Sequence, residues 1–259
     1  MSPARAGALL TILVAAGAIY GLAATSLFSF SRLEVSGATL TPTAAIDSQL
    51  GLAPGANLVT LSTEPLAAAL RQLPSLADAR VSVALPDAVQ VQVVERRPIL
   101  VWAIGNRRFL VDDQGLLFAD AGAVAPDAVT LPVITDARAR SAVFDIQTRL
   151  DPVVLDAATR LGSLTPDQVG SGAAGLAVAV NDSNGFTVAA KPTGWTAIFG
   201  LYVPSQRTPA MIPGQVQALR LLLAEAGEAN VATVVLADDR KGTYSTPKPT
   251  ATPKPSKAP

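Results

Sequence analysis

Cysteine and histidine are both absent from this chain of 259 residues. Without cysteine, the protein forms no disulfide bond, binds no metal through thiolates and has no thiol nucleophile. Without histidine, it lacks the usual general base of hydrolases and the most common metal ligand in proteins. These absences favour a protein that works by binding. We predict that it is not an enzyme and has no catalytic residues, no cofactor, no metal and no small-molecule substrate.

Charge is balanced overall but unevenly distributed along the chain. There are 20 acidic and 20 basic residues, and every acidic residue lies between Glu34 and Asp239. The last stretch carries only the positive charges of Lys248, Lys254 and Lys257. A mildly acidic central part gives no electrostatic reason to bind a polyanion, so we predict no nucleic-acid partner.

The longest apolar stretch lies near the N-terminus, over residues 6–30, and contains no charged side chain. At about 1.5 Å per residue a helix of this length is long enough to cross the hydrocarbon core of a membrane. The apolar region of a cleaved signal peptide is typically only about 7–15 residues long. The sequence therefore predicts an uncleaved transmembrane helix, with a signal peptide as the alternative. The flanking Arg5 and Arg32 favour a cytoplasmic N-terminus only slightly.

Residues from Leu33 to Pro98 predict the element order β-α-α-β-β. Leu33 and Val35 alternate with polar residues in a short strand that ends at Gly37. Two helices follow, over about 41–51 and 63–74, each with a threonine and a proline at its start. Two strands with alternating apolar residues complete the unit, at about 81–85 and 89–93.

This order resembles the POTRA domain of the FtsQ/DivIB cell-division family. The positions that carry the resemblance are Val35-x-Gly37, Ile46, Gly51, Gly55-x-Asn57-Leu58, Leu61, Leu73-Pro74-x-Leu76-x-x-Ala79-x-Val81, Pro86, Val91-x-Val93 and Glu95-Arg96-x-Pro98. The Glu-Arg-x-Pro ending, followed by Trp102 and the stretch Leu110–Phe118, is typical of this one family. The resemblance is strong from Phe30 to Phe118 and looser afterwards.

The remainder of the chain predicts a sheet backed by helices. Strands are expected at 99–104, 108–112, 116–119, 175–181, 185–190, 195–203 and 231–237, and helices from Asp151 to Gly162 and through Val216–Ala226. We thus predict an α+β fold with five parts. These are a cytoplasmic end (1–5), a transmembrane helix (6–30), a POTRA domain (31–98), a second α+β domain of FtsQ/DivIB type with a mostly antiparallel sheet (99–245), and a disordered tail rich in Pro, Lys and Thr (246–259).

Two short motifs invite a catalytic interpretation. Ser245–Lys248 fits the S-x-x-K pattern, and Lys191–Gly194 resembles the lysine-threonine-glycine of penicillin-binding enzymes. The first motif must lie on a helix for its lysine to reach the serine hydroxyl, and Pro247 opposes that helix. We therefore interpret both as turn or tail sequence.

Other polar and aromatic clusters also have plain interpretations. The pairs Asp112-Asp113 and Asp238-Asp239 cannot chelate by themselves, because adjacent strand residues point to opposite faces. We expect a turn for the first pair and a surface position for the second. The cluster Glu95-Arg96-Arg97 is expected at the end of a strand, and Trp102 and Trp195 are expected to anchor the core.

The strand at 231–237 is predicted to be the last before the tail. If it lies at a sheet edge, its unpaired N–H and C=O groups can accept a strand from a partner. In the FtsQ/DivIB family the end of this domain is where the coiled-coil pair FtsB/FtsL docks in this way. The resemblance therefore implies partner-binding residues at Thr233, Val234, Val235, Leu236, Ala237, Asp238 and Tyr244. A buried central strand is the alternative.

The resemblance implies a bitopic scaffold of the bacterial divisome that links division proteins at the septum. It would have one membrane helix, a cytoplasmic N-terminus and extracytoplasmic domains. Two other classes stay open. A POTRA-bearing export or assembly factor would need tandem POTRA units, which the remaining length does not favour. A cell-wall enzyme would show turnover that one point mutation abolishes.

Overall fold

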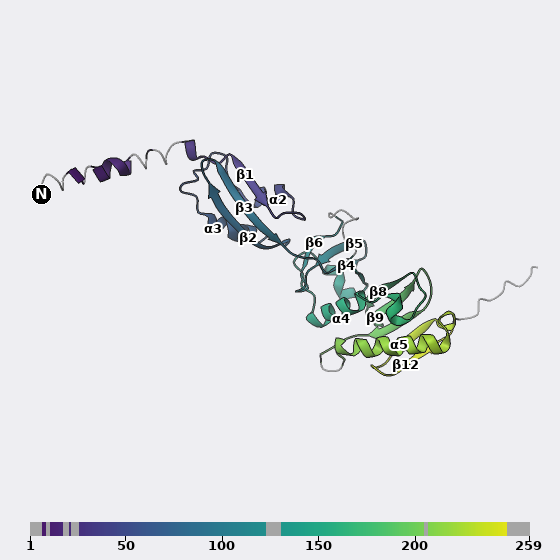
Figure 1. The fold of residues 1–259 in the computed structure, drawn as a ribbon. Coiled ribbons are helices and arrows are strands. Elements are labelled where there is room, and N and C mark those ends of the chain that lie inside the picture. Colours follow the sequence, from purple (N-terminus) through teal and green to yellow (C-terminus); the bar gives the residue numbers. More distant parts are fainter. Residues whose placement is uncertain are drawn as a thin grey trace, which may run out of the picture. The chain divides into compact units, whose positions relative to one another are not determined.

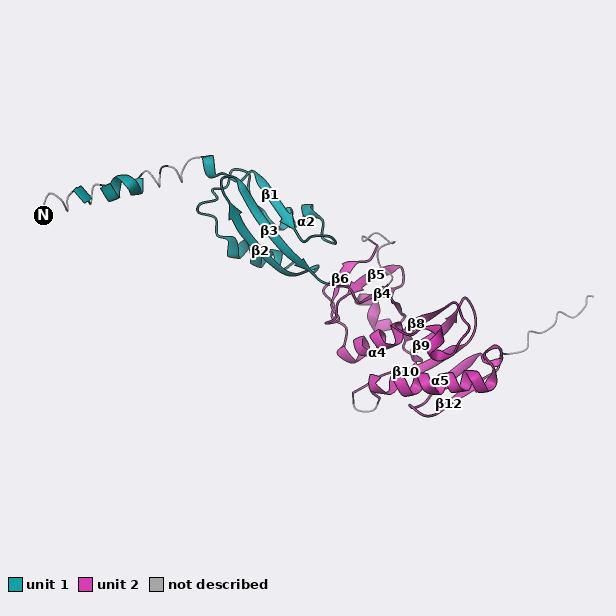
Figure 2. Cartoon of the chain, viewed as in Figure 1, with its two compact units in different colours: residues 1–96 teal, residues 97–259 magenta. Residues whose placement is uncertain are grey.

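The computed structural model describes residues 7–8, 11–17, 21, 26–122, 131–204 and 207–247 (Figure 1). The chain divides into two compact units, residues 1–96 and 97–259, which are described separately (Figure 2). The predicted cytoplasmic end, much of the predicted transmembrane helix and the predicted tail from residue 248 onward lie outside the described residues. Residues 7–8, 11–17 and 21 are helical. Among the residues described, none belongs to a helix with both the length and the apolar character needed to cross a membrane.

From residue 26 to 96, the first unit contains a three-stranded sheet and two helices. After a short 3-10 turn, η1 (Ser26–Phe28), its elements are β1 (Arg32–Ser36), α2 (Thr43–Leu50), α3 (Thr63–Leu70), β2 (Leu76–Ala84) and β3 (Ala88–Glu95). The sheet order is β1-β3-β2, with β1 parallel and β2 antiparallel to β3. The predicted β-α-α-β-β order is confirmed.

The alternating valines of β3 build the core of the first unit. Val89, Val91 and Val93 are at most 3% exposed and lie in one cluster with Ile46 of α2 and Leu70 of α3. Because strand side chains alternate between the two faces, both helices cover the same face of the sheet. The period-two pattern of the sequence is therefore the cause of the packing.

Gly37 ends β1 with a backbone φ of +85°. A Cβ atom at this position would lie 2.2 Å from the carbonyl oxygen of Val93. The close approach of the two strands therefore needs a residue without a side chain that also tolerates a positive φ. This requirement gives a physical reason for the glycine two positions after Val35.

The second unit is built on one nine-stranded sheet. Its strands are β4 (Leu100–Ile104), β5 (Arg107–Val111), β6 (Leu117–Asp120), β7 (Val133–Asp136), β8 (Gly175–Asn181), β9 (Gly185–Lys191), β10 (Thr196–Gly200), β11 (Thr233–Leu236) and β12 (Gly242–Ser245). The order across the sheet is β12-β11-β10-β9-β8-β7-β4-β5-β6. Five neighbouring pairs are antiparallel and three are parallel, so the sheet is mixed.

Two helices supply the crossovers that parallel pairing requires. α4 (Pro152–Gly162) joins β7 to β8, and α5 (Ile212–Ala226) joins β10 to β11. The described parts of the connections contain the 3-10 turns η3 (Ala139–Val143), η4 (Pro166–Val169), η5 (Pro209–Met211) and η6 (Glu228–Asn230). α4 starts where the sequence predicts, because the Asp151 side chain accepts a hydrogen bond from the backbone N–H of Val153 at 2.8 Å.

The prediction that 231–237 is the last strand is wrong. β11 is followed by a turn and by β12, which takes the outer position in the sheet. β12 was missed because its four residues, Gly-Thr-Tyr-Ser, contain no aliphatic alternation. The predicted strand 195–203 is also shorter than expected, because β10 ends at Gly200.

Candidate protein-binding edge of the second unit

β12 forms one edge of the nine-stranded sheet. It pairs with β11 alone among the described strands, in antiparallel register with Leu236 opposite Gly242 and Thr233 opposite Ser245. Thr243, Tyr244 and Ser245 are exposed, and Tyr244 retains 47% of its accessible surface. The strand therefore offers an unpaired backbone together with exposed side chains, as strand addition requires.

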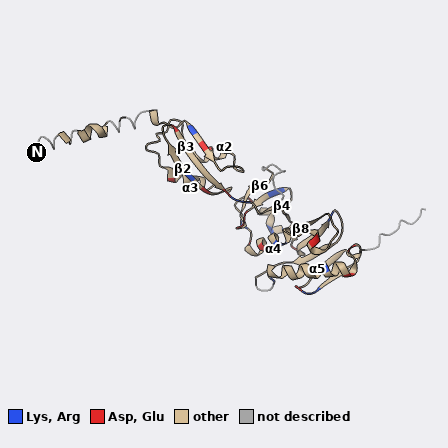
Figure 3. Cartoon of the chain, viewed as in Figure 1, with Lys and Arg blue, Asp and Glu red and all other residues tan. Residues whose placement is uncertain are grey.

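This edge carries no charge. Among β10, β11 and β12 there is no Asp, Glu, Lys or Arg. Helices α4 and α5, by contrast, carry charged residues (Figure 3). Proteins that avoid edge-to-edge pairing commonly place charged side chains, especially lysine, on an outer strand. An uncharged outer strand is thus open to a partner strand, although its shortness limits the number of backbone hydrogen bonds.

The structure distributes the residues predicted to bind a partner over three environments. Val234 and Leu236 point into the core and are 0% and 1% exposed. Val235 and Ala237 are exposed, but they belong to β11 and to the turn after it rather than to the outer strand. Tyr244 lies on the edge itself. The edge also includes Gly242, Thr243 and Ser245, which the sequence alone did not single out.

Thr233 is half-buried at the start of β11. Asp238 lies in the turn between β11 and β12 and holds its shape. One carboxylate oxygen of Asp238 accepts hydrogen bonds from the backbone N–H groups of Arg240 and Lys241, at 2.8 and 2.6 Å. These bonds hold the pKa of Asp238 below its usual range. The predicted surface position of this aspartate is confirmed, and its role is to shape the turn.

The start of helix α5 packs closely against the same turn. The backbone of Gly214 lies so close to Asp239 that a Cβ atom on the glycine would be 2.6 Å from the Asp239 carbonyl oxygen. Such a distance is well inside van der Waals contact. The position of the turn, and with it the start of β12, therefore depends on a glycine in the first turn of α5.

A buried glutamine ties α5 to the strands beneath the edge. Gln215 is fully buried, and its amide nitrogen donates hydrogen bonds to the carbonyl oxygens of Phe199 and Leu236 at 3.2 and 3.3 Å. Its amide oxygen accepts from the Tyr202 hydroxyl at 2.7 Å. Burial raises the pKa of Tyr202 well above its ordinary value, so the hydroxyl stays protonated as a donor.

Arg207 adds a second anchor at the end of β11. Its guanidinium donates hydrogen bonds to the carbonyl oxygens of Leu236 and Ala237. Carbonyl groups at the end of a strand have no ladder partner, so a side-chain donor satisfies them. Together with Gln215, this arginine gives β12 a rigid strand to pair with.

Parts of the two motifs with a possible catalytic interpretation meet: Lys191–Gly194 and Pro247 line one open cavity of the second unit, and Ser245 is not among its lining residues. Ser245 lies in β12 rather than on a helix, and Lys248 lies outside the described residues. Asp112 accepts hydrogen bonds from the backbone N–H groups of Gln114 and Leu116 at 3.0 and 2.8 Å, which confirms the turn. In the described part of the chain, no three acidic residues come together as a possible metal site.

Both tryptophans are fully buried in the core of the second unit, as predicted. The indole nitrogen of Trp102 donates to Asp136 at 3.1 Å, and that of Trp195 donates to Glu228 at 2.8 Å. A buried indole N–H needs such a partner to avoid a desolvation penalty. The two carboxylates are thus structural partners of the tryptophans.

Glu95 and Arg96 fasten the end of β3 to two loops of the first unit. The Glu95 carboxylate accepts from the backbone N–H groups of Thr39, Leu40 and Thr41 at 2.6 to 3.0 Å. Burial opposes ionisation of Glu95, but these bonds outweigh it and lower its pKa to about 2. Arg96 donates through Nε to the carbonyl oxygen of Pro74 at 2.9 Å. The expected position of the cluster at a strand end is confirmed.

A known domain family matches the first unit almost from end to end of its sheet and helices. The POTRA domain family of FtsQ type matches residues 28–96, the stretch that contains β1 to β3 with α2 and α3. Residues 28–96 form an FtsQ-type POTRA domain. The resemblance to the FtsQ cell-division family is thereby confirmed.

Relatives that match parts of the chain are named cell division protein FtsQ. The chain is 30% identical to cell division protein FtsQ of Streptomyces coelicolor over 159 residues, which cover 61% of the chain and 60% of the relative. It is 45% identical to that of an Anaeromyxobacter species over 82 residues, 32% of the chain and 27% of the relative. It is 33% identical to FtsQ of Chloroflexus aggregans over 110 residues, which cover 42% of the chain and 39% of the relative. The chain thus spans 60% or less of the length of these relatives.

Proposed function

We propose that this chain is a bitopic scaffold of the bacterial divisome, which links division proteins through its folded units. Residues 6–30 cross the cell membrane, residues 1–5 face the cytoplasm, and both units are extracytoplasmic and enriched at the division septum. Three observations support the proposal: the charge-free apolar stretch, the FtsQ-type POTRA domain, and relatives named cell division protein FtsQ. The scaffold works by binding rather than by catalysis.

The observation that carries the mechanism is the uncharged edge strand β12. An extended segment of a partner pairs with its backbone and continues the sheet by one strand. Backbone hydrogen bonds supply affinity in such an addition, and side chains that alternate along the strand supply specificity. Tyr244 contacts the partner directly, while residues 233–238 hold the edge in place.

The partner in this proposal is a small membrane coiled-coil pair of FtsB/FtsL type. The POTRA unit contacts further membrane proteins of the divisome. Nucleic acid has no place in this mechanism, since the central part of the chain is mildly acidic.

The proposal is tested by photo-crosslinking in dividing cells. A benzoyl-phenylalanine at Tyr244 is expected to trap the FtsB-type protein of the same cell. The same probe at Leu221, a more exposed position on α5 with 60% exposure, is expected to trap none. A fluorescent copy of the full chain is expected to gather at division sites, and depletion to block septation. Uniform localisation with normal division would overturn the proposal.

A further inference from the structure

A cavity of about 300 Å³ opens in the second unit, away from the β12 edge. Its floor consists of four buried side chains: Val154, Val180, Phe186 and Tyr202. Two large apolar side chains, Leu201 and Val203, lie at the rim and are 48% and 41% exposed. None of the lining residues belongs to β11 or β12, so the cavity is separate from the proposed docking edge.

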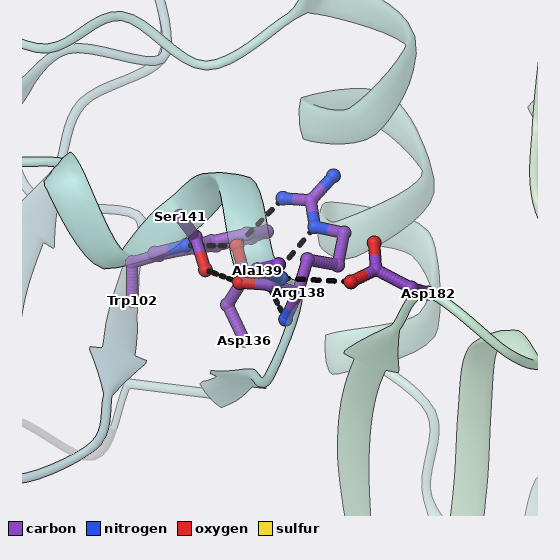
Figure 4. Close-up of polar contacts among 6 residues, drawn as sticks. All are labelled: Trp102, Asp136, Arg138, Ala139, Ser141 and Asp182. Atoms are coloured by element: carbon purple, nitrogen blue, oxygen red, sulfur yellow. Dashed lines mark hydrogen bonds and ion pairs between the residues drawn. The ribbon is translucent and has the colours of Figure 1, made fainter.

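Arg138 lines this cavity in a fixed orientation. It is 4% exposed, and its Nε and Nη2 atoms bind the two carboxylate oxygens of Asp136 at 2.9 and 2.6 Å (Figure 4). The guanidinium also lies over the ring of Trp102, with its carbon 5.8 Å from the ring centre. The planar ion pair and the ring contact leave the arginine little freedom to turn.

The remaining nitrogen of Arg138, Nη1, is buried and makes no hydrogen bond with any described residue. Figure 4 shows it directed away from Asp136. A buried N–H group without an acceptor is strongly unfavourable, and native proteins rarely contain one. Since none of the described residues supplies an acceptor here, the group is open to a water or to a ligand atom.

The rim adds two carboxylates with spare hydrogen-bonding capacity. Asp151 uses one oxygen for the backbone N–H of Val153, and Asp182 uses one for that of Ala139 at 2.7 Å. Arg140 is the exposed cation of the rim. With Arg138 and its partner Asp136, the site holds two positive and three negative side chains, so it disfavours an anionic ligand.

We propose that this cavity binds a short peptide segment of a partner protein that carries an apolar side chain next to a basic one. A backbone carbonyl of the segment accepts from Arg138 Nη1. The apolar side chain fills the floor and covers Leu201 and Val203, and the basic side chain pairs with Asp151 and Asp182. The carbonyl of the segment is a neutral acceptor, and its basic side chain is complementary to the net negative charge of the rim. The apolar floor excludes water from the hydrogen bond to Arg138.

Dipeptide probes test this site on the full chain in detergent, with methyl-labelled leucine and valine observed by NMR. N-acetyl-leucyl-lysine amide is expected to shift the methyl resonances of Val154, Leu201 and Val203 in a saturable way. N-acetyl-glycyl-lysine amide is expected to bind at least tenfold more weakly, because it leaves the floor empty. N-acetyl-leucyl-glutamate amide is expected to bind about fivefold more weakly, because it meets the rim carboxylates.

Two variants distinguish the site from non-specific binding. Leu201→Asp is expected to abolish the shifts, whereas the matched Leu221→Asp on α5 is expected to leave them unchanged. Arg138→Lys keeps the positive charge beside Asp136 but removes Nη1, and about tenfold weaker binding is expected in a variant that still unfolds cooperatively. Equal binding of the lysine and glutamate probes, or unchanged binding by Leu201→Asp, would overturn the proposal. So would an absence of saturable shifts, since Nη1 would then be satisfied by water alone.

Discussion

Glu95 and Thr39 lie 56 positions apart in the chain, yet the Glu95 carboxylate accepts hydrogen bonds from both the hydroxyl and the backbone N–H of Thr39, at 2.6 and 2.9 Å. The next two backbone N–H groups, of Leu40 and Thr41, point at the same carboxylate. Consecutive N–H groups that converge in this way form an anion-binding concavity. One side chain at the end of β3 therefore fixes the loop from which α2 departs.

The substitution Glu95→Gln is expected to destabilise the POTRA unit by about 1–3 kcal/mol, because the amide removes the negative charge and turns one acceptor into a donor. In the native protein the pKa of Glu95 is about 2, below its ordinary value of 4.5. The stability that this shift contributes is fully present above pH 4.5 and is lost as the pH falls toward 2. Urea unfolding between pH 6 and pH 2 measures it.

The matched control for this experiment is Asp47→Asn on the exposed side of α2. It removes the same charge from the same unit and is expected to change the stability by less than about 0.5 kcal/mol. Glu95→Gln should flatten the pH dependence between pH 5 and 2, and the control should leave it steep. Parallel curves for the native protein and Glu95→Gln would contradict the proposed role of this carboxylate.

Gly214→Ala is expected to lower stability, although alanine is normally the better helix former by about 1 kcal/mol. The new Cβ would lie 2.6 Å from the Asp239 carbonyl oxygen, so the turn between β11 and β12 must shift. Hydrogen exchange should accelerate at Gly242–Ser245, which report on the pairing of the edge strand. Gln217→Ala, on the exposed side of the same helix, serves as the control and should leave this exchange unchanged.

Most of the fold could be predicted from the sequence because its signals are local. Alternating valines in β3 and the Asp151-Pro152 start of α4 determine their elements within a few residues. β12 could not be predicted in this way. Its residues are polar or small, and it becomes a strand only because β11, the Asp238 turn and α5 hold it in place.

The buried ion pair of Asp136 and Arg138 could not be predicted from the sequence for a related reason. The stretch Ile134–Arg140 alternates charged and small residues and looks like an exposed loop. Only the folded sheet shows that Asp136 and Arg138 are 2% and 4% exposed and lie against Trp102. Burial of a charged pair depends on residues distant in sequence, so a local pattern does not reveal it.

Gln215→Leu is expected to cost about 2–4 kcal/mol of stability despite a similar side-chain volume. The substitution leaves the Phe199 carbonyl and the Tyr202 hydroxyl without their buried partner, while the Leu236 carbonyl keeps its bond from Arg207. Chemical denaturation measures the loss. Gln217→Leu, two residues along on the exposed side of α5, is the control and should change stability by less than about 0.5 kcal/mol. Similar effects of the two variants would show that the buried network contributes little.

Tyr244→Lys tests whether β12 accepts a partner strand. A lysine on an outer strand discourages strand addition, while the side chain, already 47% exposed, can project into water. We expect stability to change by less than about 1 kcal/mol and the affinity for the FtsB-type partner to fall at least tenfold. Affinity is measured with the full chain in detergent. Leu221→Lys on α5 adds the same charge outside the edge and should bind the partner normally. If Tyr244→Lys binds as tightly as the native protein while Val235→Lys does not, the partner contacts the exposed side chains of β11 rather than the β12 edge.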